Sequence, residues 1–128
     1  MTELRLSSEH RDDCVIVTVA GELDIVTSRQ LDEQLTSVRR KQRCIILDLA
    51  EVDFMDTSSL AVIVGHWKKL TARGGTLALA GARYRYTKTL WITGLADRLP
   101  MFNTVPEAVA ACAAAEPATG QPPGQSSE

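Results

Sequence analysis

Hydrophobic positions along the chain form strand-like runs separated by segments with helical spacing. Residues 14–20 are an apolar run rich in β-branched side chains, which predicts a strand, and the alternating residues 4–6 predict a short strand before it. Asp12 and Asp13 suit a hairpin turn between these two strands. Residues 45–49 form another continuous apolar run, which predicts a buried strand near the centre of a sheet.

The rest of the chain predicts four helices and a further strand. Thr27 or Ser28 caps the first helix, and a pair of glycines at 74–75 ends the second, which has the clearest periodicity. Thr104 and Glu107 form a capping box before the last helix. The helices cover about residues 31–38, 60–70, 84–92 and 105–115, and the further strand covers residues 76–80.

The alternation of these strands and helices predicts an α/β domain. We expect a mixed central sheet of about four strands with a parallel centre, packed by about four helices, over residues 1–115. Residues 116–128 are rich in Pro, Gly, Gln and Ser, and this composition predicts a disordered C-terminal tail.

Acidic residues follow the ends of the first two long strands. Right-handed crossovers bring the loops that follow parallel strands to the same edge of the sheet. We therefore expect Glu22 and Asp24 to lie near Asp53, Asp56 and Ser58.

Composition excludes several classes of function. The chain has 128 residues, 45% of them hydrophobic, and a net charge of -2, so no basic field favours nucleic acid. The densest basic run, residues 39–43, is interpreted as a solvated helix end. Apolar segments are shorter than the roughly 20 residues that span a bilayer, and residues 1–13 are too polar for a signal peptide. We expect a cytoplasmic protein with no membrane partner.

The three cysteines are far apart in the sequence and show no C-x-x-C spacing. This pattern argues for a reducing compartment, and against a zinc site or a disulfide framework. Cys14 and Cys44 open apolar runs and are predicted to be core thiols, whereas a redox role for Cys112 stays open.

The hydroxyls of Thr57, Ser58 and Ser59 stand where a predicted strand meets the clearest helix. A helix N-terminus presents backbone N–H groups and a positive dipole end, so it suits a hydroxyl that gains and loses a phosphate. The local sequence equally allows Thr57 or Ser58 to be only the helix cap. No cofactor or metal is predicted.

Enzymatic alternatives are weaker. Ser58 lacks flanking glycines, and neither His10, in a polar turn region, nor His66, predicted to be a partly exposed helix residue, is placed to serve it as a base. A Mg²⁺ site with a phosphoaspartate, as in receiver domains, would use Asp48, Asp53 and Asp56.

Several motifs in fixed order resemble the STAS domain of anti-sigma factor antagonists. They include Gly-Glu-Leu-Asp after a strand, Ile-Leu-Asp-Leu in the next strand, and Val-Asp-Phe-Met-Asp-Thr-Ser before the clearest helix. The resemblance spans about residues 4–112. Its motifs are residues 21–24, 46–49, 52–58, 74–75, 93–95 and 102–108.

The resemblance implies the STAS fold and a bacterial partner switch. The unphosphorylated antagonist would bind an anti-sigma factor, which is also an ATP-dependent serine kinase, and so release a sigma factor. Phosphorylation by that kinase would end the interaction, and a metal-dependent phosphatase of the PP2C type would restore it. The alternative is a STAS-fold binding module with another protein or a small ligand as partner and no phosphorylation.

The resemblance also assigns roles to residues. The family's phosphoacceptor matches Ser58, with Thr57 as second choice, and its acidic partner-contacting residue matches Asp24. Ser59 stands where the family pattern has glycine. The expected partner-binding residues are Glu22, Asp24, Asp56, Thr57, Ser59 and Leu60.

Overall fold

A computed structural model describes residues 3–115, so the predicted tail at 116–128 lies outside the described residues. The strands are β1 (Leu4–Arg11), β2 (Cys14–Leu23), β3 (Cys44–Met55), β4 (Thr76–Ala80) and β5 (Met101–Phe102). The helices are α1 (Ser28–Lys41), α2 (Thr57–Ala72), α3 (Tyr84–Thr93), the short 3₁₀ helix η1 (Leu95–Asp97) and α4 (Val105–Ala115).

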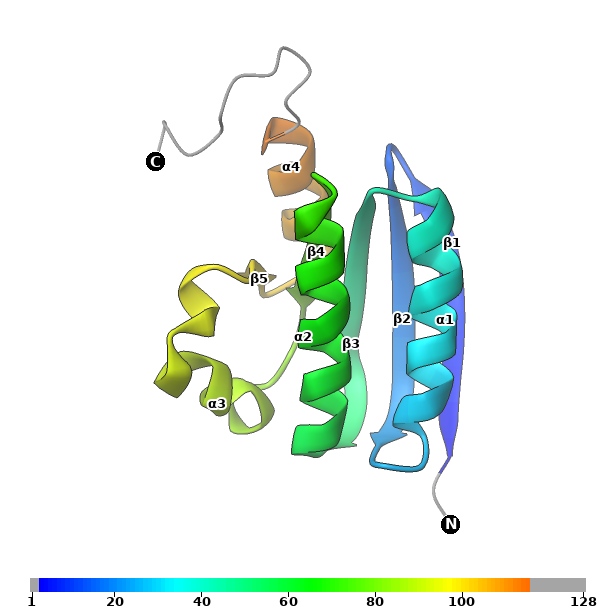
Figure 1. The fold of residues 1–128 in the computed structure, drawn as a ribbon, viewed down its shortest axis with the longest axis vertical. Helices are drawn as coiled ribbons and strands as arrows, with labels where there is room; N and C mark the ends of the chain where they lie inside the picture. Colours follow the sequence, from blue (N-terminus) through cyan, green and yellow to red (C-terminus); the bar gives the residue numbers. More distant parts are fainter. Residues whose placement is uncertain (1–2, 116–128) are drawn as a thin grey trace.

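The strands form one sheet in the order β1-β2-β3-β4-β5 (Figure 1). β1 is antiparallel to β2, and the other neighbours are parallel, which confirms the predicted mixed sheet with a parallel centre. The sheet has five strands because β5 adds a two-residue strand that is too short to show a pattern in the sequence. β1 extends well beyond the predicted residues 4–6. Its later residues are polar and exposed on an edge strand, so they show no apolar alternation in the sequence.

Helices cover both faces of the sheet. α1 and α2 lie side by side on one face, and α4 packs behind β4 on the other (Figure 1). The core follows the alternation of side chains along each strand. In β2, Val15 and Val17 join the large core under α1 and α2, whereas Cys14 and Ile16 join the smaller core under α4.

β3 continues past the predicted residues 45–49 and leads directly into α2. Two register shifts against β2 fall in the second half of this strand and interrupt its apolar alternation. The apolar run in the sequence therefore ends at residue 49 although the strand continues to Met55. On the neighbouring strand, Gly21 has a φ of +112, and a Cβ there would collide with the carbonyl oxygen of Glu3. A glycine is therefore required where the chain enters the loop that precedes α1.

The glycine stops after α2 and α3 and the Thr104 cap of α4 are confirmed, whereas Thr27, at the N-cap position of α1, makes no side-chain capping hydrogen bond. α2 ends at Ala72, just before Gly74 with a φ of +80, and Gly94 with a φ of +85 caps α3. The Thr104 hydroxyl accepts a hydrogen bond from the N–H of Glu107 at 3.3 Å, and α4 follows. Within the described part of the chain, no helix is both long enough and apolar enough to span a bilayer.

His66 is not the partly exposed residue that its sequence context predicted. It is 3% exposed between α1 and α2. Its Nε2 lies 2.7 Å from Oδ1 of Asp32, and its Nδ1 accepts a hydrogen bond from Nε of Arg39 at 3.2 Å. Two polar partners on the neighbouring helix satisfy the ring, and such partners cannot be read from the period of α2 alone.

The prediction against a disulfide was also wrong. Cys14 and Cys44 form a disulfide with a Cα–Cα distance of 4.6 Å. They open β2 and β3, and parallel pairing of these strands brings the two residues together although 30 positions separate them. Sequence spacing does not reveal such a pair because the register of the strands creates it.

Candidate functional site

Two strand ends and two helix starts meet at one edge of the sheet. β2 leads into α1 and β3 leads into α2, and these connections lie side by side (Figure 1). The N–H of Asp56 donates a hydrogen bond to the carbonyl of Leu23 at 3.1 Å, which joins the two connections. The expectation that the Asp24 loop lies beside Asp56 is thereby confirmed, and the negative charge of Asp24 acts on the carboxyl group of Asp56.

Asp56 caps α2. Its Oδ1 accepts hydrogen bonds from the Ser58 hydroxyl at 2.6 Å, the Ser59 N–H at 3.1 Å and the Ser59 hydroxyl at 3.1 Å. Neither Thr57 nor Ser58 is the N-cap, because both already belong to the first turn of the helix. The cap role that the sequence allowed for these hydroxyls is therefore filled by the aspartate before them.

The hydrogen bonds to Asp56 also set its charge state. Desolvation by burial raises the pKa of this carboxyl, and nearby Asp24 raises it further. The bonds from the Ser58 hydroxyl and from the N–H and hydroxyl of Ser59 outweigh both effects, so the pKa of Asp56 lies below its ordinary value of 3.8. Asp56 is accordingly an anion at neutral pH, directly beside the Ser58 hydroxyl.

The three consecutive hydroxyls differ in their access to solvent. Thr57 is exposed, Ser58 is partly buried, and Ser59 is 0% exposed. Leu60, which follows, is 6% exposed and belongs to the core. Ser59 and Leu60 were both expected to contact a partner, but their side chains point inward, so the accessible hydroxyls are those of Thr57 and Ser58.

Asp24 organises the loop between β2 and α1. Its Oδ1 accepts hydrogen bonds from the N–H groups of Val26 and Thr27, each at 2.9 Å. The Thr27 hydroxyl accepts from the N–H of Asp24 at 2.9 Å and donates to the carbonyl of Glu22 at 2.7 Å. These bonds give the loop a defined shape, while the side chain of Glu22 remains exposed.

This loop exposes two apolar side chains that were not among the predicted partner-binding residues. Ile25 is 73% exposed and Val26 is 71% exposed. They line a hollow of about 480 Å³ together with residues of the first turns of α1, namely Arg29, Gln30 and Glu33. An adjacent Ile-Val pair outside any strand or helix period was the signal available in the sequence.

The third side of the site is formed by α3. The Tyr86 hydroxyl donates a hydrogen bond to the carbonyl of Asp53 at 2.6 Å. The rings of Tyr86 and Phe54 form a T-shaped pair with 6.3 Å between ring centroids, and Phe54 itself is 45% exposed. The site thus combines exposed apolar side chains from two connections with an anionic carboxylate at the start of α2.

Comparison with known proteins identifies the family. The family model described as the STAS domain matches residues 5–108. The chain belongs to the STAS domain family. An anti-sigma F factor antagonist of Paenibacillus polymyxa is 31% identical to it over 102 residues, which cover 78% of this chain and 87% of the relative. An anti-sigma-B factor antagonist of Listeria monocytogenes is 35% identical over 96 residues, covering 74% of this chain and 84% of the relative.

Solved structures show the same fold. An anti-sigma factor antagonist from Mycobacterium paratuberculosis has a TM-score of 0.76 at 24% identity, covering 85% of this chain and 93% of its own. The antagonist SpoIIAA in its unphosphorylated form has a TM-score of 0.72 at 22% identity, covering 86% of this chain and 97% of its own. The mixed sheet with helices on both faces is therefore the STAS fold.

This STAS domain does not bring together the residues that a serine nucleophile with a histidine base, or a receiver-type phosphoaspartate site, would need. His66 lies on the same helix as Ser58, about 12 Å further along the axis, and its ring is bonded to Asp32 and Arg39. Among residues 3–115, the only gathering of three or more potential metal ligands consists of cysteines, so Asp48, Asp53 and Asp56 do not converge as a receiver-type site requires.

Proposed function

We propose that this STAS domain is an anti-sigma factor antagonist controlled by phosphorylation of Ser58. In its unphosphorylated form it binds an anti-sigma factor that has ATP-dependent serine kinase activity, and a sigma factor is thereby released. The names of its relatives support this class of function. The observation that carries the assignment is the accessible Ser58 hydroxyl in the first turn of α2, whose N-terminus is hydrogen-bonded to the connection that carries the exposed Ile25 and Val26.

The surface around Ser58 suits reversible docking. Ile25, Val26 and Phe54 offer apolar area for burial, and Glu22 and Thr57 add polar groups at its margin. Among the hydroxyls, Ser58 is preferred as phosphoacceptor over the more exposed Thr57 because it matches the family's motif position. Asp24 contributes by fixing the loop that carries the apolar pair.

A phosphate at Ser58 would oppose this docking. It adds about 1.5 to 2 negative charges at neutral pH, next to the anionic Asp56 and near Asp24. The dipole and first-turn N–H groups of α2 tolerate the charge locally, so the fold is preserved. A partner that buried the same surface would have to desolvate the charge, which costs several kcal/mol.

A phosphatase of the PP2C type would restore the neutral hydroxyl, and the whole cycle would take place in the cytoplasm, where transcription occurs.

Phosphate mapping tests the assignment of Ser58. The purified protein is incubated with Mg·ATP and an anti-sigma factor kinase from the same genome, and the modified residue is located by mass spectrometry. Wild type and Thr57→Ala should take up one phosphate at Ser58, whereas Ser58→Ala should take up none. Phosphate on Thr57 or elsewhere in the wild-type protein contradicts the assignment.

Binding measurements test the consequence of the phosphate. Ser58→Ala should bind the anti-sigma factor about as well as wild type, and both the phosphorylated protein and Ser58→Asp should bind more weakly. Equal affinity of wild type and phosphorylated protein would refute the switch. Recovery of a partner that is not a kinase, with no phosphate uptake by Ser58, would instead favour a STAS-fold binding module without phosphorylation.

A further inference from the structure

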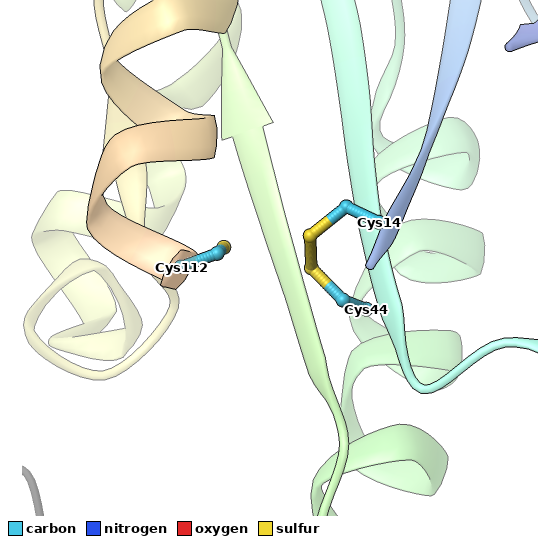
Figure 2. Close-up of side chains that lie close together, drawn as sticks. All are labelled: Cys14, Cys44 and Cys112. Carbon is cyan, nitrogen blue, oxygen red and sulfur yellow. A yellow bond between two sulfur atoms is a disulfide. The ribbon is translucent and has the colours of Figure 1, made fainter. Parts of the chain in front are cut away.

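Three cysteine sulfur atoms meet at the end of the sheet that lies opposite the Ser58 site. Cys14 opens β2, Cys44 opens β3, and Cys112 belongs to α4. Their Sγ atoms all lie within 4.8 Å of one another. Figure 2 shows the Cys14–Cys44 disulfide on the two strands, with the Cys112 side chain directed toward it from the helix.

This arrangement satisfies the main geometric need of thiol–disulfide exchange. A thiolate must approach one sulfur of a disulfide, and the sulfur that leaves must then be available to react again. Cys112 is a thiol held beside an existing disulfide by the packing of α4 on the sheet. Each sulfur lies within 4.8 Å of both others, so each of the three possible pairings joins sulfur atoms that are already neighbours.

A cavity leads small molecules to two of the three cysteines. It has a volume of about 450 Å³, and its lining includes Cys44, Cys112, Lys41 and Arg43. Cys14 does not line it and is 5% exposed. An external thiol or disulfide therefore meets Cys44 or Cys112 first, and Cys14 is the internal member of the group.

We propose that Cys14, Cys44 and Cys112 form a thiol–disulfide exchange site for small anionic thiols and disulfides that enter through this cavity. Lys41 and Arg43 outnumber Asp13 on the cavity wall, so the site attracts a carboxylate-bearing ligand of that class. The proposal stands independently of the proposed anti-sigma function, because it uses none of the residues around Ser58.

Oxidation of the reduced protein proceeds by three exchanges. The Cys112 thiolate attacks one sulfur of a small disulfide, forms a mixed disulfide and releases one small thiol. The Cys44 thiolate then attacks the Cys112 sulfur, which releases the second small thiol and leaves a Cys44–Cys112 bond. Finally the Cys14 thiolate attacks Cys44, forms the Cys14–Cys44 bond seen in the structure and returns Cys112 as a thiolate. Two protein thiols are oxidised and one small disulfide is reduced to two thiols.

The intermediate pairing changes how α4 is attached. In the Cys14–Cys44 form the helix is held to the sheet by non-covalent packing, in which Ala108 and Val109 take part. In the Cys44–Cys112 form the helix is covalently linked to β3. The exchange site can therefore tie or release the helix that covers this face of the sheet.

Trapping each alternative disulfide tests the proposal. Cys14→Ser and Cys44→Ser are reduced, treated with oxidised glutathione, quenched with acid and mapped by mass spectrometry. Cys14→Ser should form a Cys44–Cys112 bond within one molecule, and Cys44→Ser should form a Cys14–Cys112 bond, each with loss of two hydrogen atoms. Cys112→Ser should retain the Cys14–Cys44 bond but form it more slowly than wild type does.

The wild-type protein provides a test that does not depend on the folding of a variant. Reduced wild type is mixed with oxidised glutathione, and samples are quenched with acid over time. Glutathione should appear first on Cys112, followed by the Cys44–Cys112 bond and then the Cys14–Cys44 bond. Lys41→Gln should slow the reaction with oxidised glutathione and leave the reaction with the neutral 2-hydroxyethyl disulfide unchanged.

Two results would overturn the proposal. One is a wild-type protein in which Cys14 and Cys44 become oxidised while Cys112 never carries glutathione or a protein disulfide. The other is a reduced protein that binds Zn²⁺ through all three thiolates and forms no disulfide with oxidised glutathione, which would make the cluster a metal site.

Discussion

The hydroxyl of Ser58 donates to Oδ1 of Asp56 across 2.6 Å, so the proposed phosphoacceptor is bonded to the residue that caps its own helix. The same oxygen also accepts from the N–H and hydroxyl of Ser59. A phosphate on Ser58 would remove one of these three donors and leave two. The helix therefore keeps its cap. Phosphorylation changes the charge of the surface and leaves the fold intact.

Replacement of the cap should destabilise the domain. Asp56→Ala removes the acceptor for the Ser59 N–H, and we expect the free energy of unfolding in urea to fall by about 1 kcal/mol. Asp53→Ala is a suitable control because Asp53 is exposed and precedes the helix. An Asp56→Ala protein as stable as the control would mean that the cap is energetically unimportant.

The sequence was sufficient for much of this site because the decisive signals are local. The apolar run from Ile45 and the period that starts at Leu60 place a strand-to-helix junction at residues 53–58, and the structure has one there. Because β2 and β3 are parallel and crossovers between such strands are right-handed, the loops that follow them lie at the same edge of the sheet. This places Asp24 near Asp56, as expected.

Features created by register or by a second element were not predictable in this way. The Cys14–Cys44 bond depends on how β2 pairs with β3, and the burial of His66 depends on partners in α1. The exposure of Ile25 and Val26 depends on the turn around Asp24, whose carboxylate accepts from the N–H of Val26.

The exposed apolar pair should matter for binding and not for folding. Ile25→Ser and Val26→Ser remove side chains that are mostly in solvent, so thermal unfolding should change little. If they are buried by the anti-sigma factor, the double variant should bind about tenfold more weakly or worse, equivalent to about 1.4 kcal/mol. The affinity can be measured by calorimetry.

Ile92→Ser is a matched control, since Ile92 is 78% exposed and lies at the C-terminal end of α3, about 9 Å along the helix axis from Tyr86. We expect its affinity to equal that of wild type. Full affinity of the Ile25→Ser, Val26→Ser double variant would exclude this loop from the interface.

Restoring the family's glycine at position 59 should weaken this protein. Ser59 is buried in the first turn of α2, where its hydroxyl bonds to Asp56. Ser59→Gly removes that bond and adds the backbone entropy of glycine, so we expect a loss of about 1 to 2 kcal/mol in unfolding free energy. Ser59→Ala loses the hydroxyl alone, and the difference between the two variants isolates the backbone contribution. If Ser59→Gly were the more stable of the two, the backbone at this position would favour glycine as the family pattern does.

The buried His66 should make stability depend on pH. Arg39 donates to Nδ1, so Nε2 carries the proton that faces Asp32, and the ring is neutral. Desolvation by burial is the largest effect and lowers the pKa of His66 from its ordinary 6.5. The positive charges of Arg39 and Lys69 lower the pKa further, and together these effects outweigh the hydrogen bond and charge of Asp32, which raise it.

Because the folded pKa of His66 is below the unfolded one, the unfolded chain binds the proton at higher pH than the folded chain does. The contribution of the neutral ring is therefore complete above the ordinary pKa of 6.5 and is lost as pH falls through the folded value. Urea unfolding at about pH 7.5 and about pH 5.5 should show a larger loss of stability for wild type than for His66→Gln, which cannot titrate. His10→Gln, at an exposed position in β1, controls for the other histidine and should behave like wild type. A wild-type protein whose loss of stability on acidification equals that of His66→Gln would show that the buried ring does not carry the effect.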